Sequence, residues 1–323
     1  MPDGRQRGKG EFGMNEHRII AYGEILWDLL PEGKQLGGAP FNFAYRCQSL
    51  GHRTYMISKL GRDSLGEEAA QKAAALGMDC AFIQWDQDHP TGQVKVSFDE
   101  DHEPHYDIVA GVAYDYIDVT DAMVAQMRES ECICFGTLIQ RAETSRDSLY
   151  RLLDEAQEAT KLLDLNLRPK CYSHETITTS LEYADLLKLN EGEARYLAEL
   201  FSLPDQSLEE LGQALLQRWA LKQCLITLGE YGLAAFNQAG EQVYEAGYSV
   251  EVADAVGAGD ACTAGFISHY LDEEPLETCC RYGNALGALV ATLPGATGSL
   301  EPGQLTDFLQ NPPERLVHPD FAN

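Results

Sequence analysis

Short apolar segments alternate with longer amphipathic segments over much of the chain. Apolar runs of strand length occur at 132–135, 161–165, 186–189 and 224–228. Amphipathic stretches of helical length follow the first three of them, at 145–159, 175–183 and 192–200. A short apolar run is typical of a strand that is buried on both faces, and a period near 3.6 residues is typical of a helix packed on one side. Repeated strand–helix units predict an α/β fold with a mostly parallel sheet covered by helices on both faces.

The beginning of the chain has the same order of elements. An apolar run over 18–26 predicts a strand, and after a turn at Gly37-Gly38 a helical pattern covers 40–50. In sheets of this kind ligands bind beyond the carboxyl ends of the strands. Polar residues that follow the predicted strands are therefore the first candidates for a functional site.

The segment 91–110 has a different pattern. Apolar side chains alternate with polar ones on both sides of an acidic turn at 99–103, and the alternating positions are Val94, Val96, Phe98, Tyr106 and Ile108. Alternation with a period of two predicts a β-hairpin. The hairpin fits poorly inside a parallel core, so we expect a small β lid that covers the site. An antiparallel extension at the edge of the main sheet is the alternative.

Length and composition indicate one domain. The 323 residues suit a single α/β domain over 18–323, preceded by a flexible leader over 1–17. No apolar run approaches the roughly 20 residues that a membrane span requires, and no secretory signal is visible, so a soluble cytoplasmic protein without a membrane partner is expected. Nine cysteines without a Cys-x-x-Cys pair predict reduced thiols that serve mainly in packing.

The charge of the chain excludes one class of partner. The formal net charge of −27 repels nucleic-acid phosphates, and no local basic patch offsets it. We therefore expect no nucleic-acid partner. The excess of acidic residues fits either a salty cytoplasm or an acidic protein of an ordinary one, and composition does not separate the two.

The most specific chemistry lies in the segment 254–260, Asp-Ala-Val-Gly-Ala-Gly-Asp, which runs into a helical stretch. Gly257 and Gly259 allow a tight turn without side chains between the backbone N–H groups and a ligand. The first N–H groups of a helix have no intrahelical acceptor, and the helix dipole is positive there, so the turn suits a phosphoryl group. Asp260 would face the same space, where a carboxylate can accept the proton of an attacking hydroxyl. The alternative is a glycine turn with Asp260 as a helix cap.

Two glycine-centred blocks carry a family resemblance. The first is Gly-Gly-Ala-Pro-Phe-Asn-Phe-Ala at 37–44, and the second is the segment 254–260. Together they resemble the two signatures of the ribokinase-like carbohydrate kinases, also called the PfkB family, and the resemblance extends from about residue 19 to residue 299. It implies a three-layer α/β/α fold with a small β lid, and transfer of the γ-phosphoryl group of ATP to a sugar hydroxyl. Neither a P-loop nor a Gly-x-Gly-x-x-Gly fingerprint is present.

The resemblance implies roles for individual residues. Gly257, Ala258 and Gly259 would form an anion hole, with Asp260 as the base; Ala255 departs from the threonine that is frequent in the family. Sugar would be bound by Asp28, at the end of the first strand, and by Gly37, Gly38, Asn42 and Arg168. The residues expected at the nucleotide are Asn190, Thr227, Gly229, Gly232 and Asn284. Glu193 would hold Mg²⁺ through water. A monovalent cation such as K⁺, whose requirement stays open, would bind at Asp254, Val256, Val290, Leu293, Gly295 and Ser299.

The sugar is less certain than the chemistry. The segments 23–28, 136–141 and 164–169 look most like fructokinases of this family. A 2-keto-3-deoxygluconate kinase has a similar Asp-x-Asn-x-Arg element, and Arg168 would also suit that acid substrate. A catalytically silent sugar-binding regulator would be expected to lack Asp260 or Glu193, and both are present. Whether a sheet edge or the hairpin forms a homodimer is open.

Overall fold

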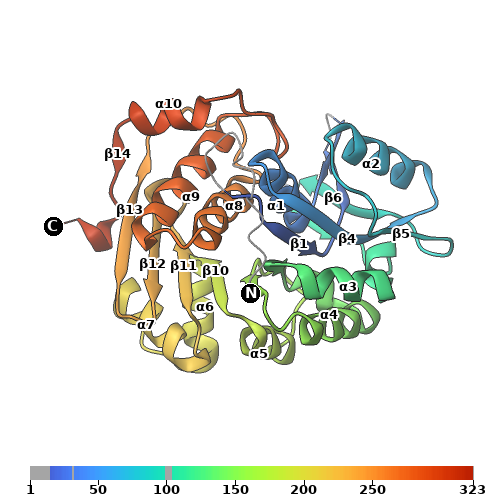
Figure 1. Cartoon of the computed structure of the whole chain (residues 1–323), viewed down its shortest axis with the longest axis horizontal. Coiled ribbons are helices and arrows are strands. Elements are labelled where there is room, and N and C mark those ends of the chain that lie inside the picture. The colour runs from blue at the N-terminus through green and yellow to red at the C-terminus, as the bar shows by residue number, and fades with distance from the viewer. Residues whose placement is uncertain (1–14, 31–32, 99–103, 323) are drawn as a thin grey trace, which may run out of the picture.

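The computed structural model describes residues 15–30, 33–98 and 104–322. The strands of its main sheet are β1 (Arg18–Tyr22), β4 (Arg53–Gly61), β5 (Ile83–Asp86), β8 (Cys132–Phe135), β9 (Thr160–Asp164), β10 (Leu186–Asn190), β11 (Gln223–Thr227), β12 (Gly232–Asn237), β13 (Gln242–Tyr248) and β14 (Arg315–Leu316). In this described part of the chain the ten strands have the order β14-β13-β12-β11-β10-β9-β8-β1-β4-β5 (Figure 1). Neighbours from β5 to β11 are parallel, and β12 to β14 extend the sheet as antiparallel strands.

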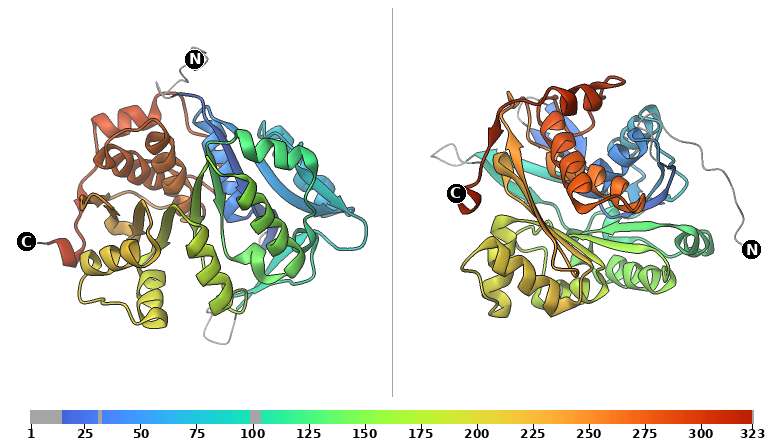
Figure 2. Two further views of the ribbon diagram at one scale, coloured as in Figure 1. Left: turned by 60° about the horizontal axis from the view of Figure 1, so that its bottom comes forward. Right: turned by 60° about the vertical axis from the view of Figure 1, so that its left-hand side comes forward.

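Helices cover both faces of this sheet (Figures 1 and 2). On one face lie α1 (Ala39–Ser49), α2 (Ser64–Ala75), α8 (Ala258–Leu271), α9 (Leu276–Ala291) and α10 (Gln304–Gln310). On the other face lie α3 (Asp121–Glu129), α4 (Glu143–Glu155), α5 (His174–Tyr183), α6 (Glu191–Phe201) and α7 (Leu208–Trp219). Successive residues of β1 point to opposite cores: Ile19 packs with the first group of helices and Ile20 with the second. The predicted three-layer α/β/α fold is confirmed.

A second sheet stands beside the main one. It consists of β2 (Leu26–Leu30), β3 (Gly33–Gly37), β6 (Gly92–Phe98) and β7 (Pro104–Ile108), in the order β3-β2-β6-β7. Strands β6 and β7 are antiparallel, with Val94 opposite Ile108, so the alternating pattern did correspond to a hairpin. The acidic turn at 99–103 lies outside the described residues. The hairpin is half of this sheet, because β2 and β3 supply the other half.

The prediction of one strand over 18–26 was wrong. Strand β1 ends at Tyr22, and the chain leaves the main sheet at Gly23 and enters the small sheet as β2. A Cβ atom at Gly23 would lie 2.4 Å from Cγ of Pro40 in α1, so this crossing requires a residue without a side chain. Asp28 consequently lies in the middle of β2, and not at the end of the first strand of the main sheet.

The predicted leader over 1–17 extends too far. Residues 1–14 lie outside the described part of the chain, but Asn15 and His17 belong to the folded domain. Asn15 Nδ2 donates to Asp272 Oδ1 at 2.8 Å, and the ring of His17 lies between Asp272 and Glu131, with N–O distances of 2.8 and 3.1 Å. These contacts attach the first residues of the domain to the C-terminal end of α8 and to the start of β8.

The buried His17 predicts a pH-dependent contribution to stability. Burial lowers the pKa of His17, but Glu131 and Asp272 raise it above its ordinary value. A histidine whose pKa is higher in the folded than in the unfolded state stabilises the fold at pH values below its unfolded pKa of about 6.5. This contribution disappears as the pH rises through the folded pKa. His17→Gln is therefore expected to lower the free energy of unfolding by about 1–3 kcal/mol at pH 6. The loss at pH 8.5 should be smaller, as urea unfolding would show.

The control for this experiment is His174→Gln, since His174 is an exposed residue of α5. A neighbouring group, His52, faces His17 with its ring centroid 5.5 Å away, and burial lowers the pKa of His52 to about 4. His52 therefore remains neutral over this range and does not produce the same pH dependence. An equal loss of stability at both pH values in His17→Gln would contradict the ionic role.

Two further findings concern the whole domain. All nine cysteines are free, and eight of them are buried, in agreement with thiols that serve in packing. Among the described residues, no helix combines the length and apolar character that a membrane crossing would need.

Candidate active site

The N-terminus of α8 forms a tight turn. Its N-cap, Gly257, has φ +79° and ψ −3°, a left-handed conformation that favours glycine. A Cβ atom at this position would also lie 2.4 Å from Cβ of Ala296, so the turn is packed closely against the loop that follows α9. The N–H of Ala258 donates to the backbone oxygen of Ala255 at 3.3 Å. The N–H groups of Gly257 and Gly259 have no intrahelical acceptor at this position, which is compatible with the predicted anion hole.

Asp260 lies in the first turn of α8, as predicted, and faces α1. Asn42 Nδ2 donates to Asp260 Oδ2 at 2.9 Å, a contact between residues 218 positions apart. The two glycine blocks of the sequence therefore meet through one hydrogen bond. Asn42 was expected to bind sugar hydroxyls with its amide group, but the structure uses the NH₂ group of this amide to orient Asp260.

The environment of Asp260 suits a base that works near neutral pH. Burial raises its pKa to about 6, and repulsion by Asp164 acts in the same direction. Lys188, the hydrogen bond from Asn42, and Arg168 lower it. A carboxylate with such a pKa is ionised at pH 7 and still has appreciable affinity for a proton, which is the property required in general-base catalysis.

The expected sugar residues lie between the small sheet and α1. A Cβ atom at Gly38 would be 2.4 Å from the backbone oxygen of Glu24, so the absence of a side chain there serves packing inside the protein. A Cβ atom at Gly37 would be 3.2 Å from Asp28 Oδ2, so this glycine leaves room beside the Asp28 carboxylate. Burial raises the pKa of Asp28, while Arg168 lowers it. Arg168 is exposed, and its positive charge lowers the pKa values of Glu24, Asp28 and Asp260.

One residue of this region was not assigned a role from the sequence. Glu24 is buried with 4% of its surface exposed, and its Oε1 accepts a hydrogen bond from the N–H of Ala39 at 3.2 Å. Burial raises its pKa to about 7, and Arg168 lowers it. Glu24 also lines a small cavity together with Phe43, Thr137, Asp164 and Asn166. The sequence feature that could have identified Glu24 was its acidic side chain inside an otherwise apolar run.

Arg141, in the segment 136–141 after β8, makes its hydrogen bonds with residues near the hairpin. Arg141 donates to both carboxylate oxygens of Asp115, at 2.8 and 2.9 Å, and to the backbone oxygen of Val109 at 2.7 Å. Val109 directly follows β7. Arg141 thus fixes the place where the hairpin rejoins the main domain.

The residues expected at the nucleotide begin at the carboxyl ends of neighbouring strands. Asn190 ends β10 and caps α6 by accepting the N–H of Glu193 at 2.9 Å, and Thr227 ends β11. Gly229 has φ +60° and open space around it. Gly232 serves the fold, because a Cβ atom there would lie 2.0 Å from the backbone oxygen of Glu245.

Two of the residues predicted to bind ligands, Asn284 and Glu193, form hydrogen bonds with backbone groups of the protein. Asn284 is buried and donates to the backbone oxygen of Ala246 at 2.7 Å, which attaches α9 to β13. Glu193 accepts the N–H groups of Leu167 at 2.7 Å and of Asn190 at 2.9 Å. Each carboxylate oxygen of Glu193 has a further lone pair, so a contact with hydrated Mg²⁺ is compatible with these bonds.

The residues expected at a monovalent cation come from two segments that the structure brings together. Asp254 accepts the N–H of Val256 at 2.9 Å and that of Gly295 at 3.2 Å, and thereby joins the turn before α8 to the loop after α9. Val290 and Leu293 belong to the end of α9 and this loop, and Ser299 is exposed. Both carboxylate oxygens of Asp254 thus already accept N–H groups, and binding of K⁺ at these residues stays a prediction.

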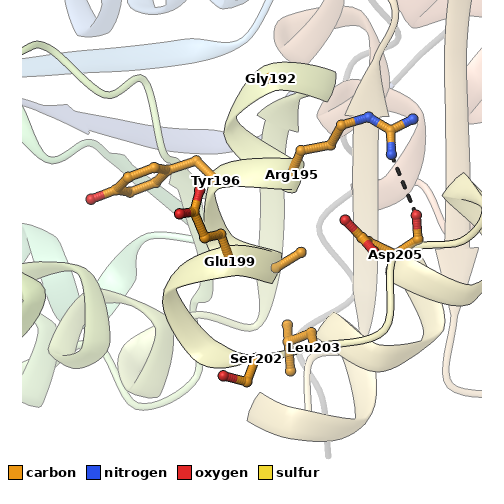
Figure 3. A pocket seen from close by; sticks show the side chains of 8 residues that line it. Gly192, Arg195, Tyr196, Glu199, Ser202, Leu203 and Asp205 are labelled. Atoms are coloured by element: carbon orange, nitrogen blue, oxygen red, sulfur yellow. Dashed lines mark hydrogen bonds between the residues drawn. The ribbon is translucent and has the colours of Figure 1, made fainter.

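A separate hollow lies on the outer side of α6 and contains none of the predicted site residues (Figure 3). Its lining includes Arg195, Tyr196, Glu199 and Asp205, and Arg195 Nη1 donates to the backbone oxygen of Asp205 at 3.4 Å. This hollow is open to solvent. Asn42 and Asp260 lie elsewhere, near the N-termini of α1 and α8.

Comparisons with known proteins identify the family of the chain. The model of the pfkB family carbohydrate kinases matches residues 22–302. The chain is 27% identical to the probable fructokinase-3 of Arabidopsis thaliana over 97% of the chain and 96% of that protein. It is also 27% identical to a 2-dehydro-3-deoxygalactonokinase of Haloferax volcanii over 90% of the chain and 96% of that protein. An ATP-bound fructokinase structure from Xylella fastidiosa has the same fold, with a TM-score of 0.79, 21% identity, and coverage of 91% and 98%.

The family match covers most of the chain. The chain belongs to the pfkB family of carbohydrate kinases and is an ATP-dependent sugar kinase.

Proposed function

We propose that this kinase is a fructokinase in which Asp260 removes the proton of the acceptor hydroxyl. The observation that carries the proposal is the position of Asp260, in the first turn of α8, held by Asn42 and given a pKa of about 6 by its surroundings. Asp260 belongs to the same helical turn as Gly257 and Gly259, so one turn would provide both proton removal and N–H groups that stabilise the phosphoryl charge; the N–H of Ala258 is bonded to Ala255.

The remaining residues bind and orient. Asp28 would accept hydrogen bonds from sugar hydroxyls, and Gly37 would leave room for the sugar beside this carboxylate. Asn190, Thr227 and Gly229 would lie along ATP, and Glu193 would hold a water of hydrated Mg²⁺. When bound, Mg²⁺ supplies positive charge to the phosphates. The small sheet would close over the sugar and keep water from the phosphoryl group.

The charge of the sugar region favours a neutral substrate. Glu24, Asp28 and Asp260 all interact electrostatically with Arg168, so three carboxylates share the influence of one positive charge. A substrate that carries its own carboxylate would add a further negative charge to this group. Fructose has none, which agrees with the fructokinase relative. The 27% identical 2-dehydro-3-deoxygalactonokinase and the exposed Arg168 support a sugar acid as the alternative.

A substrate panel tests this assignment. ADP release from ATP would be measured with fructose, ribose, 2-keto-3-deoxygluconate and nucleosides, with and without K⁺. We expect the highest kcat/KM for fructose. A higher kcat/KM for 2-keto-3-deoxygluconate would establish the alternative, and the absence of turnover with any substrate, combined with sugar binding, would indicate a silent regulator.

Glu24 predicts a specific change in selectivity. Because burial raises its pKa to about 7, its negative charge develops as the pH rises through neutrality. Discrimination against 2-keto-3-deoxygluconate should therefore increase from pH 6 to pH 8. In Glu24→Gln we expect the ratio of kcat/KM for the acid to that for fructose to rise about tenfold at pH 8, equivalent to about 1.4 kcal/mol. Steady-state kinetics at the two pH values would measure this.

The control for this change is Glu209→Gln, since Glu209 is exposed on α7. It removes the same charge from the protein without altering the sugar region, and should leave the ratio unchanged. An unchanged ratio in Glu24→Gln at pH 8 would show that Glu24 does not discriminate between the two substrates.

A further inference from the structure

A buried ion pair lies between the two central strands that end at the site. Lys188 of β10 and Asp164 of β9 are partners in the parallel register, and Lys188 Nζ lies 3.0 and 3.1 Å from the two carboxylate oxygens of Asp164. The side chains are 10% and 8% exposed. Moving two charges out of water is costly, so such a pair requires a compensating role or excellent geometry.

The pair is in contact with the first turn of α8. A Cβ atom at Gly259 would lie 3.4 Å from Lys188 Nζ. The hydroxyl of Thr263 lies 2.9 Å from the backbone oxygen of Gly259 and 3.4 Å from Asp164 Oδ2. Residues 259 and 263 are one turn apart on the same face of the helix, so the ion pair supports the turn that also carries Asp260.

The charges around Asp260 come from several elements. Asp164 of β9 repels its negative charge, and Lys188 of β10 and Arg168 after β9 attract it. Glu24 and the buried thiol of Cys134 in β8 also interact with it. Burial lowers the pKa of Lys188, but Asp164, Asp260 and Glu193 raise it above its ordinary value, so the ammonium stays charged.

Removal of Lys188 and removal of the charge of Asp164 should therefore shift the pKa of Asp260 in opposite directions. Without Lys188, two carboxylates would remain in one buried region with no ammonium between them, and at least one would hold a proton at neutral pH. Without the charge of Asp164, the ammonium would act on Asp260 alone and favour its ionised form. The influence of the ion pair on Asp260 can therefore be tested by the direction in which the pKa of Asp260 shifts as well as by the size of the shift.

We propose that Lys188 is a positioning residue that keeps Asp260 ionised and holds the first turn of α8 in place, and that Asp164 fixes Lys188 for this purpose. The inference rests on the proposed role of Asp260 as the base. Lys188 would act through Asp260 and the turn, and the proposal requires no contact between Lys188 and the sugar.

The test is the dependence of kcat/KM on pH between 5 and 9, with the preferred sugar of the panel. We expect the acidic limb of the profile to move up by about one pH unit in Lys188→Met, which is a tenfold change in the protonation equilibrium. In Asp164→Asn the limb should move down, and in Lys188→Arg it should stay near its original position. A supporting role without electrostatic coupling would lower kcat/KM equally at all pH values. Unmoved limbs in both Lys188→Met and Asp164→Asn, together with an unchanged pKa of Asp260 in both variants, would overturn the proposal.

A second measurement separates this inference from the proposed base. The carboxyl ¹³C resonance of Asp260, identified by its loss in Asp260→Asn, would be titrated in the ligand-free protein. If the pKa of Asp260 rises in Lys188→Met while the kinetic limb does not move, the ion pair acts as proposed and another group is the base. If the pKa of Asp260 does not change, the ion pair does not control it. Should Lys188→Met fail to fold, as circular dichroism would show, the titration in Asp164→Asn decides, and a downward shift supports the proposal.

Discussion

Replacement of Asp260 by asparagine is expected to lower kcat by roughly 10²–10⁴-fold, the range associated with loss of a general base. Asparagine has nearly the same shape and can still accept the hydrogen bond that Asn42 donates, so the turn should keep its geometry. Sugar binding, measured by isothermal titration calorimetry, should change little. The loss would then be confined to the chemical step.

The control is Asp121→Asn, because Asp121 also lies in the first turn of a helix but is exposed on α3. It should retain full turnover. The wild-type kcat/KM should fall below a pH of about 6, since protonation of Asp260 removes the base. Near-normal turnover in Asp260→Asn would refute its assignment as the base.

The second large effect is expected at Gly257. Alanine there would retain a left-handed backbone, which costs about 1–2 kcal/mol for a residue with a side chain. Its Cβ atom would lie 2.4 Å from Cβ of Ala296, so the turn or the loop after α9 must also move. A displacement of about 1 Å at the anion hole is sufficient to reduce kcat by about 10²-fold. Thermal unfolding and steady-state kinetics would measure the two consequences separately.

The chain offers a matched control for this substitution. Gly303 is the N-cap of α10 with φ +80°, close to the +79° of Gly257, but nothing lies within 4 Å of its missing Cβ. Gly303→Ala should thus have the backbone cost without the clash or the catalytic loss. The double variant Gly257→Ala with Ala296→Gly should recover part of the activity. Equal activity in Gly257→Ala and Gly303→Ala would show that the anion hole tolerates the displacement.

Local sequence patterns were sufficient for most elements of the fold. The strands predicted at 132–135 and 186–189 correspond to β8 and β10, because both are continuous apolar runs that are followed by helices. The break at Gly23 was not visible, because it depends on Pro40 of α1, which approaches Gly23 only after the chain has turned back. Apolar residues on both sides of the break made one strand the simpler prediction.

The candidate site was predictable to a similar degree. Asp260 and the glycine turn are local, since a helix start and a flexible turn can be recognised from a few neighbouring residues. Asn42 was predicted to bind sugar hydroxyls, and its hydrogen bond to Asp260 was not predicted. Lys188 was not considered, because in the sequence it is a single charged residue within an apolar strand. Its meaning depends on Asp164, 24 positions earlier, which the parallel register places opposite it.

By itself the sequence determined the alternation of strands and helices, the layered fold, and the glycine turn with its carboxylate, because these follow from periodicity and from the dihedral preferences of neighbouring residues. The tertiary structure alone decided which charges surround that carboxylate. Asn42 donates to Asp260 at 2.9 Å, and Asp164 and Lys188, an ion pair on two neighbouring strands, act on its charge. Electrostatic and hydrogen-bonding effects depend on such distances and on burial, and a linear order of residues contains neither.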